Sequence, residues 1–297
     1  MKKTLLIVGC GDIALRVAPL LQKHYRIIGL CRNEDNFGQL QSHGIIPIHG
    51  DLDDPKSLEK LAGIAQWVLH LAPPPNHGLR DGRTKHLLSA LSKRTKKHGP
   101  ILPQRLLYIS TSGVYGNCDG ALIDETYPVH PENDRAFRRL DAEKNIRNWG
   151  KRNRVAVSIL RVPGIYAADR LPLTRLRDGH PALLATEDSY TNHIHADDLA
   201  RIVCAALQFA KPNRIYHTSD DSHLKMGDYL ELVADYFDYP HPPRITREEA
   251  KHRISPLMFS FMKESRRLKN TRMKKELHVR LQYPTVRQGI EAARTVK

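Results

Sequence analysis

A short glycine-rich segment between a predicted buried strand and a predicted helix constrains the fold of this chain more than any other feature. The apolar run at residues 5–8 is followed by Gly-Cys-Gly-Asp-Ile-Ala, and apolar residues at helical spacing begin directly afterwards. In such a turn the first glycine permits a tight bend, the second lets the backbone approach a ligand, and a small third residue lets the helix pack on the strand. Free N–H groups at the start of the helix favour a bound pyrophosphate. The segment therefore predicts a dinucleotide site, formed by Gly9, Gly11, Asp12, Ile13 and Ala14.

Strand-like apolar runs alternate with helix-like segments through the first half of the 297-residue chain. The runs lie at residues 5–8, 26–30, 45–48, 67–71, 106–109 and 155–160. Repeated β-α-β order predicts an α/β fold with a Rossmann-type doubly wound parallel sheet. After Tyr166 the pattern loosens and becomes mainly helical. We therefore predict a nucleotide-binding domain and a smaller, mainly helical C-terminal substrate lobe, the first formed by residues 1–167 and 192–219 and the second by residues 168–191 and 220–297.

The residue at the end of the second predicted strand indicates which dinucleotide binds. An NAD site requires Asp or Glu about 20 residues beyond the glycines, where it accepts hydrogen bonds from the ribose hydroxyls. This chain has Arg32 there and no acid at the strand end. Because a guanidinium can pair with a 2′-phosphate and stack on adenine, Arg32 predicts a preference for NADP(H), with NAD(H) as the alternative cofactor. The competing interpretation is that Arg32 is a solvated residue at the end of a strand.

The charge is distributed unevenly along the chain. There are 47 Lys and Arg against 32 Asp and Glu, a net charge of +15, and residues 244–297 contain 15 of these cations against 5 of the acids. Such a basic region can bind nucleic acid or anionic small molecules, or it can be a solvated helical surface. We do not expect nucleic-acid binding, because no recognised module surrounds the most basic cluster, at residues 263–275.

Hydropathy and cysteine usage limit where such a protein can work. No apolar run approaches the ~20 residues needed to span a bilayer. The four cysteines contain no Cys-x-x-Cys pair, which argues against a zinc site or a disulfide framework. We therefore expect a cytoplasmic protein that has no membrane association and no bound metal.

Several further strings follow the predicted strands in order. Gly-Asp-Leu-Asp-Asp begins at Gly50, Ser-Thr-Ser-Gly-Val-Tyr-Gly at Ser110, and Leu-Arg-Val-Pro-Gly-Ile-Tyr at Leu160. Asn-His-Ile-His-Ala-Asp-Asp-Leu-Ala begins at Asn192, and Ser-Arg-Arg-Leu-Lys-Asn begins at Ser265. Over nearly its whole length the chain therefore resembles the extended and atypical short-chain dehydrogenase/reductase superfamily, in the branch of NAD-dependent epimerase/dehydratase-like proteins.

The resemblance implies roles for individual residues. Asp51 and Leu52 would contact the adenine, and Pro163 would cover the nicotinamide. Thr111 would be the active-site hydroxyl that hydrogen-bonds a substrate oxygen. The residues that would line the nucleotide after the fourth strand are Leu71, Ala72 and Pro73. Three residues would lie on loops opening onto the cofactor cleft, from which a proton donor could come: Tyr115 as a catalytic residue, and Tyr166 and Asn192 as substrate contacts.

The chain departs from the superfamily at its Tyr-x-x-x-Lys pair, in which the lysine lowers the tyrosine pKa and the tyrosine exchanges a proton with the substrate. Aligned on Ala142 and Glu143, the tyrosine position is Arg135 and the lysine position is Arg139. Arginine stays protonated in proteins, so Arg135 cannot act as a base. The two guanidiniums could instead bind a carboxylate or phosphate of the substrate, or they could be solvated helix residues.

Two functions are compatible with these observations. The first is an NAD(P)-dependent oxidoreductase or epimerase-like enzyme that acts on a small polar, anionic or nucleotide-linked substrate, with a catalytic centre at Thr111, Tyr115, Arg135 and Arg139. The second is a non-catalytic NADP(H)-binding redox sensor or regulatory protein, which the missing tyrosine and lysine favour. The resemblance also implies a homodimer, for which the apolar stripes at residues 87–91 and 140–149 could form the contact.

Overall fold

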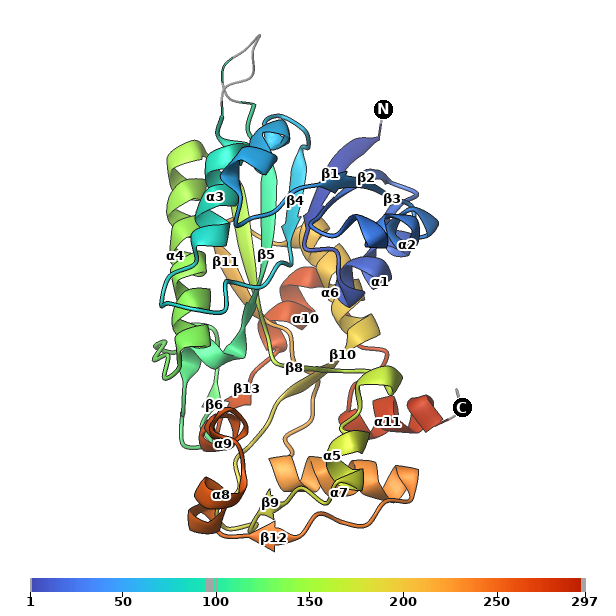
Figure 1. Ribbon diagram of the computed structural model, residues 1–297, viewed down its shortest axis with the longest axis vertical. Helices are drawn as coiled ribbons and strands as arrows, with labels where there is room; N and C mark the ends of the chain where they lie inside the picture. The colour runs from blue at the N-terminus through green and yellow to red at the C-terminus, as the bar shows by residue number, and fades with distance from the viewer. Residues whose placement is uncertain (1, 94–98, 100, 295–297) are drawn as a thin grey trace.

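Seven parallel strands form the central sheet of the computed structural model, which describes residues 2–93, 99 and 101–294 (Figure 1). Their order across the sheet is β3-β2-β1-β4-β5-β7-β11, so the chain winds outward from β1 in both directions. This doubly wound α/β topology confirms the fold class predicted from the sequence. The strands are β1 (Lys3–Val8), β2 (Tyr25–Cys31), β3 (Ile45–His49), β4 (Trp67–His70), β5 (Arg105–Thr111), β7 (Ala156–Val162) and β11 (Arg214–His217).

The first strand shows why the sheet could be predicted. Residues 5–8 of β1 are all fully buried. Leu5 and Ile7 pack in the core on one face of the sheet, whereas Leu6 and Val8 pack in the core on the other. A strand that is covered on both faces is apolar throughout rather than at alternate positions. The same packing places the glycine segment at the carboxyl edge of the sheet, where ligands of such folds bind.

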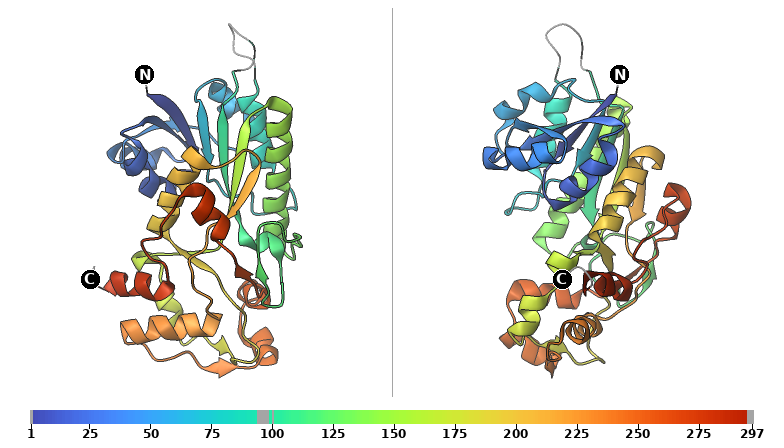
Figure 2. Two further views of the ribbon diagram at one scale, coloured as in Figure 1. Left: turned by 180° about the vertical axis from the view of Figure 1, so that it is seen from behind. Right: turned by 90° about the vertical axis from the view of Figure 1, so that its right-hand side faces the viewer.

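Helices cover both faces of the sheet (Figure 2). One layer contains α1 (Asp12–Leu21), α6 (Ala196–Phe209) and α10 (Thr271–Leu277), and the other contains α3 (Gly82–Leu91), α4 (Asp134–Asn153) and the 3-10 helix η2 (Pro55–Leu61). The position of α10 differs from the predicted domain division. Its Met273 and Leu277 are buried in the core of the nucleotide domain, not in the lobe. A short basic helix with two buried residues does not show in the sequence which layer it covers.

The remaining elements form a second body beyond the carboxyl edge of the sheet, at the bottom of Figure 1. One apolar cluster there surrounds Leu230 and Val233, and another surrounds Ile245. The elements are α5 (Leu173–Arg177), β9 (Ala182–Leu183), α7 (Met226–Phe237), β12 (Arg244–Ile245), α8 (Arg247–Arg253), α9 (Pro256–Lys263) and α11 (Val286–Arg294). Within the described residues, no helix combines the length and the apolar character that crossing a membrane requires.

Two short strand pairs lie between the bodies. β8 (Gly164–Tyr166) pairs with β10 (His193–His195), and β6 (Leu122–Ile123) pairs with β13 (Arg267–Leu268). The second pair brings a segment from near the C-terminus alongside residues that follow β5. Segments that are far apart in the sequence therefore meet where the nucleotide domain faces the lobe.

The apolar stripes of α3 and α4, which could have formed a homodimer contact, pack against the central sheet of the same chain. Leu87, Leu91, Ile146 and Trp149 are buried in the core under the sheet, so these side chains are not available for contact with a second copy. The indole N–H of Trp149 donates to the Ser92 hydroxyl at 2.8 Å. The sequence alone could not distinguish these alternatives, because an apolar stripe has the same period whether a sheet or another subunit covers it.

Candidate active site

The glycine segment after β1 forms a backbone that requires glycine at one position. Gly9 has a φ of +93°, and a Cβ at this position would lie 2.5 Å from the backbone nitrogen of Ala72. Gly11 is the N-cap of α1 and provides no side-chain cap, so the first N–H groups of the helix are left for a ligand. Ala14 is fully buried where α1 packs on the sheet. The loop thus has the open, donor-rich form that a pyrophosphate needs.

A cavity of about 280 Å³ lies beside this loop. The ends of β1 and β2 and the segments that follow β3 and β4 meet there at the carboxyl edge of the sheet. The predicted cofactor residues that line it are Gly9, Arg32, Asp51, Leu52, Ala72 and Pro73, whereas Gly11, Asp12, Ile13, Ala14 and Leu71 lie outside its lining. Arg32 makes no ion pair or hydrogen bond within the described structure, so its guanidinium is free to bind a ligand at this edge.

A second arginine, which sequence reasoning missed, lines the same cavity. Arg83, in the first turn of α3, donates to both carboxylate oxygens of Asp53, with its Nε 2.9 Å from Oδ1, and to the carbonyl of Pro74 at 3.3 Å. The hydrogen bond from Arg83 lowers the pKa of Asp53. Thirty residues separate this pair, so no local pattern could have revealed it. The cavity therefore contains two guanidiniums, one free and one bound to an acid.

Asp12 belongs to an ion-pair network at the start of α1. Its Oδ1 accepts from Arg16 Nε at 2.9 Å, and its Oδ2 lies 3.6 Å from Arg170 Nη1. Arg16 also pairs with Asp197 at 2.6 Å. Arg170 lies in the 3-10 helix η4 (Ala168–Arg170), which follows β8. Two guanidiniums thus balance the carboxylate that stands nearest the predicted pyrophosphate site.

A larger cavity, of about 390 Å³, lies between the sheet edge and the lobe. The end of β5, the first turn of α4 and the segment after β7 supply one wall, and the lobe supplies the other. The predicted residues that line it are Thr111, Arg135, Pro163 and Asn192. Three further predicted residues, Tyr115, Arg139 and Tyr166, do not. We call this space the central cavity.

Thr111 and Arg135 present unused donors to the central cavity. The Thr111 oxygen accepts from the backbone N–H of Gly113 at 3.1 Å, and its hydroxyl hydrogen has no acceptor among the described residues. Arg135 likewise makes no hydrogen bond or ion pair there. Desolvation lowers the pKa of Arg135, and repulsion from Arg139 and Arg138 adds to the effect. Arg135 is nevertheless exposed, and its unpaired guanidinium is available to form charged hydrogen bonds with an anion.

Arg139 has a different environment from Arg135, although it lies one turn further along the same helix. It is buried, and its Nη1 donates to the Ile109 carbonyl at 2.8 Å and to the Tyr108 hydroxyl at 3.0 Å. Burial raises the pKa of Tyr108 to about 12. These bonds fasten α4 to β5 and leave the guanidinium outside the lining of the central cavity.

Tyr115 is held inside the protein instead of opening onto the cleft. It ends the 3-10 helix η3 (Ser112–Tyr115), and its oxygen lies 2.6 Å from Nε2 of His217. Because Nδ1 of His217 faces the Lys269 carbonyl at 3.1 Å, Nδ1 carries the proton and Nε2 accepts from the tyrosine. Burial raises the pKa of Tyr115 to about 12 and lowers that of His217 to about 3. The Tyr115 hydroxyl therefore donates its hydrogen bond to His217.

Tyr166 and Asn192 also serve the surrounding structure. Tyr166 is buried edge-on against His195, with ring centroids 5.2 Å apart, and its hydroxyl faces the Thr285 carbonyl at 3.4 Å. Asn192 does line the central cavity. Its amide nevertheless donates to the Arg266 carbonyl at 2.9 Å and accepts from the Leu268 N–H at 2.9 Å. Asn192 thus holds the segment around β13 against the cavity wall.

Glu264 is the functional candidate that sequence reasoning missed. It is buried, and it is the one acid among the residues that line the central cavity in the described structure. Its Oε1 accepts from Asn133 Nδ2 at 2.9 Å, and its Oε2 accepts from Arg266 Nη1 at 2.8 Å. A Cβ placed on Gly113 would lie 3.5 Å from the Thr111 hydroxyl and 4.0 Å from Glu264 Oε2. The carboxylate and the hydroxyl therefore flank the same point.

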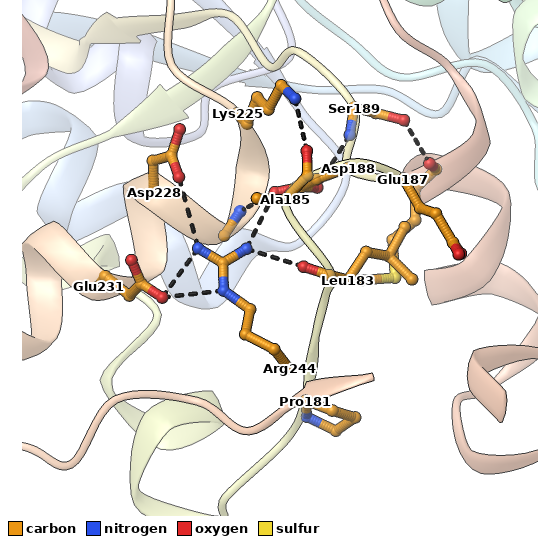
Figure 3. A network of polar contacts seen from close by, with 12 residues as sticks. Pro181, Leu183, Ala185, Glu187, Asp188, Ser189, Lys225, Asp228, Glu231 and Arg244 are labelled. Atoms are coloured by element: carbon orange, nitrogen blue, oxygen red, sulfur yellow. Dashed lines mark hydrogen bonds and ion pairs between the residues drawn. The ribbon is translucent and has the colours of Figure 1, made fainter. Parts of the chain in front are cut away.

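The lobe wall of the central cavity is held by a half-buried arginine, Arg244 (Figure 3). Arg244 donates to Glu231 at 2.8 Å, to the Leu183 carbonyl at 2.8 Å and to Asp188 at 3.3 Å. Asp188 in turn accepts from the backbone N–H of Ser189 at 2.8 Å, and Ser189 lines the cavity. This network fixes the segment that carries Ser189 and Tyr190 to the site.

The fold, the glycine loop and the two cavities define a dinucleotide-binding α/β protein of the Rossmann class. Residues 14–218 match the NAD dependent epimerase/dehydratase family, and the chain belongs to this family. The family match begins at Ala14, the last residue of the glycine segment, so only the geometry of Gly9 and Gly11 supports a dinucleotide site at the two glycines. Among curated proteins, none matches the chain significantly in sequence.

Solved structures with this fold extend over almost the entire chain. A functionally unknown conserved protein from Silicibacter pomeroyi is 27% identical, with a TM-score of 0.82 over 99% of each chain. UDP-glucuronic acid 4-epimerase from Bacillus cereus, solved with UDP-glucuronic acid and NAD, is 18% identical, with a TM-score of 0.75 over 98% of each chain. UDP-glucose 4-epimerase from Thermotoga maritima is 15% identical, with a TM-score of 0.77 over 98% of this chain and 97% of that one. Likeness to the two epimerases shows the fold alone.

Proposed function

We propose that this chain is an NADP(H)-dependent oxidoreductase whose substrate is a small molecule that carries a carboxylate or another anionic group. One observation carries the proposal: Arg135, whose guanidinium makes no ion pair or hydrogen bond within the described residues, lines the central cavity together with Thr111, whose hydroxyl hydrogen has no acceptor there. The cavity volume of about 390 Å³ suits a compact substrate. The Bacillus cereus epimerase, which was solved with UDP-glucuronic acid and NAD, supports an anionic substrate in this fold.

The residues at the sheet edge fit a bound NADP(H). The pyrophosphate would be held by the uncapped N–H groups of α1 beside Gly9, where a larger residue would collide with Ala72. The 2′-phosphate would pair with Arg32, with Arg83 close by in the same cavity. The nicotinamide supplies hydride transfer when the cofactor is bound. The chain itself must orient the substrate and exchange its proton.

In the proposed reaction, Thr111 and Arg135 orient the substrate. Thr111 donates its hydroxyl hydrogen to the reacting oxygen, and Arg135 binds the anionic group through parallel hydrogen bonds. Arg135 stays charged and so takes no part in proton transfer. Substituting arginine for the superfamily tyrosine therefore exchanges a proton donor for an anion anchor, and the proton must come from another residue.

Glu264 is the residue we assign to proton transfer. When the substrate is an alcohol, its O–H bond would break and the proton would pass to the Glu264 carboxylate. The oxidised nicotinamide would supply the acceptor for the hydride that the carbinol carbon loses as the C=O bond forms. Asn133 and Arg266 keep the carboxylate in place through both protonation states. In the reverse direction the Glu264 carboxyl returns the proton to the carbonyl oxygen. Geometry supports this assignment.

Calorimetric titration with NADPH and NADH, followed by a turnover screen, tests the proposal. NADPH is expected to bind about tenfold or more tightly than NADH, and Arg32→Ser should remove most of this difference. Nicotinamide absorbance is then followed with small 2-oxo acids, neutral aldehydes and UDP-sugars. Turnover confined to the 2-oxo acids supports the proposal. Tight cofactor binding without any turnover contradicts it and favours the redox-sensor alternative, which the missing tyrosine also allows.

A further inference from the structure

The last turns of α4 carry a row of exposed cations that nothing in the proposed function uses. Lys144, Arg147 and Lys151 are exposed, and none of them makes an ion pair within the described residues. We propose that this face of α4 binds the sugar-phosphate backbone of a nucleic acid without reading its sequence. The proposal goes beyond the proposed function and does not depend on it.

Helix geometry puts these three cations on one side. Positions i, i+3 and i+7 lie on the same face of an α-helix, and a rise of 1.5 Å per residue spreads them over about 10 Å. A shallow groove of about 470 Å³, which also contains Asn213, runs beside them. A second groove of about 360 Å³ lies between α3 and α4, and its rim carries Lys85 and Arg152. The cations of these two grooves together make the outer side of α4 a basic surface.

The two acidic residues of α4 nearest to this surface already have partners on other parts of the protein. Glu143 faces inward and pairs with Arg161 at 2.7 Å. The Asp141 carboxylate accepts from the Asp81 N–H and from the Asn145 amide. Neither α3 nor residues 144–153 of α4 contain an acidic residue. The positive potential of the face therefore remains available to an incoming polyanion.

The basic C-terminal region differs from this face in how its charge is used. Arg244 pairs with Glu231, Arg272 with Glu125 and Lys274 with Asp221. Although residues 244–297 hold more cations in total, internal acids neutralise several of them. On α4, by contrast, the exposed cations of residues 144–152 form no ion pair within the described structure and stand together on one helix.

Two features favour a nucleic acid over a protein partner. Protein interfaces need a desolvated apolar or aromatic anchor at their centre. Trp149, the aromatic residue of this stretch, is buried and bonded to Ser92. Phosphate binding gains its free energy from released counterions and needs no such anchor. A second copy of the chain is also disfavoured, because pairing this face with itself would bring like charges together.

Fluorescence anisotropy with a labelled single-stranded RNA and the matching duplex tests the proposal. The wild-type chain should bind both with a Kd of roughly 1–100 µM and weaken steeply as salt is raised. The variant K144Q/R147Q/K151Q should bind about tenfold or more weakly, with a salt slope smaller by about 2 to 3. The control K269Q/K275Q/R280Q removes the same charge from exposed C-terminal positions and should change binding by less than about twofold.

The remaining outcomes overturn the proposal. Absence of binding by the wild-type chain at low salt would remove it, as would an equal loss in the two triple variants, which would indicate attraction to net charge alone. Competition by poly-glutamate as strong as that by unlabelled RNA of equal charge would point instead to an acidic protein. Circular dichroism of both variants shows that the fold is intact. Failure of the turnover screen leaves this test unaffected, because the two experiments share no residue.

Discussion

Both halves of α4 contain basic side chains, but Arg138 and Arg139 in its first half are buried, whereas those in its second half are exposed to solvent. In the first turns, Arg138 and Arg139 point into the protein and donate to the carbonyls of Gly78 and Ile109. In the last turns, Lys144 and its basic neighbours point into solvent and pair with nothing in the described structure. One helix therefore contains both buried and free cations. The role of each follows from what its turn packs against, which neither composition nor net charge can reveal.

The first half of α4, residues 134–143, is called the inward half, and residues 144–153 are called the outward half. The basic side chains of the two halves differ in dielectric environment as well as in partners. Arg138 and Arg139 are each 7% exposed, and the Nε of each has no hydrogen-bond partner. Backbone carbonyls accept some of their hydrogen bonds, and neither guanidinium forms an ion pair within the described residues. Repulsion from both lowers the pKa of Arg135. On the outward half, water and salt screen each cation, so only a polyanion can bind there with useful affinity.

The largest expected effect concerns Glu143, the acid on the inward face of α4. Glu143→Ala should lower the free energy of unfolding by about 3–5 kcal/mol, because it leaves the Arg161 guanidinium buried without its partner. Urea denaturation followed by circular dichroism measures the loss. Glu143→Leu combined with Arg161→Met removes both charges and should recover part of the stability. A loss below about 1 kcal/mol for Glu143→Ala would mean that this inward side is solvated like the outward one.

The next effect is a pH dependence from His217, which the inward network buries. Burial lowers its pKa to about 3, whereas in the unfolded chain it is about 6.5. As the pH falls through 6.5, the unfolded chain binds a proton that the folded chain cannot, so stability is lost on acidification. Between pH 7 and pH 5, the wild-type chain should lose about 2 kcal/mol more than His217→Gln. Parallel stability curves for the two proteins would contradict a buried, neutral His217.

Arg135, in the first turn of α4, provides a test of the cavity end of the helix. Arg135→Leu should weaken binding of oxalate, a small anionic probe, by about 10- to 100-fold in the presence of NADPH, because charged hydrogen bonds of this kind contribute about 1.5–3 kcal/mol. Isothermal titration measures the change. Arg135→Lys keeps the positive charge but loses the forked guanidinium, so its affinity for oxalate should lie between those of the wild type and Arg135→Leu. Lys144→Leu, on the outward face, is the matched control and should bind oxalate as the wild type does. Equal weakening in both would indicate a general effect of charge.

Local features of the sequence predicted much of the fold and of the cofactor edge. The glycine segment, the buried run in β1 and the position of Arg32 each depend on neighbours within a few residues, so their geometry is encoded locally. The structure then places Arg32 and Gly9 at one cavity. Binding of NADP(H) there stays a prediction that the calorimetric test decides.

Contacts between distant segments could not be predicted in this way. Glu264 meets Asn133 across 131 residues, and Arg83 meets Asp53 across 30. Tyr115 lies in a string that the resemblance places at the cleft. The turn of η3 instead directs it to His217, which is 102 residues away. A pattern of residue types shows which side chains are suited to chemistry, but packing of the lobe decides which of them reach the cavity.

The smallest expected effect tests the outward half directly. Replacing Lys144, Arg147 and Lys151 with Gln should change the free energy of unfolding by less than about 0.5 kcal/mol, because exposed side chains without partners contribute little. Two opposing terms should nearly cancel. Like-charge repulsion at helical spacing is relieved, while favourable interaction of cations with the C-terminal end of the helix dipole is lost. Urea denaturation at low and high salt measures both, since salt screens them. A loss above about 1 kcal/mol would show that these cations have a structural partner, and a weaker RNA complex of this variant could then no longer be attributed to charge alone.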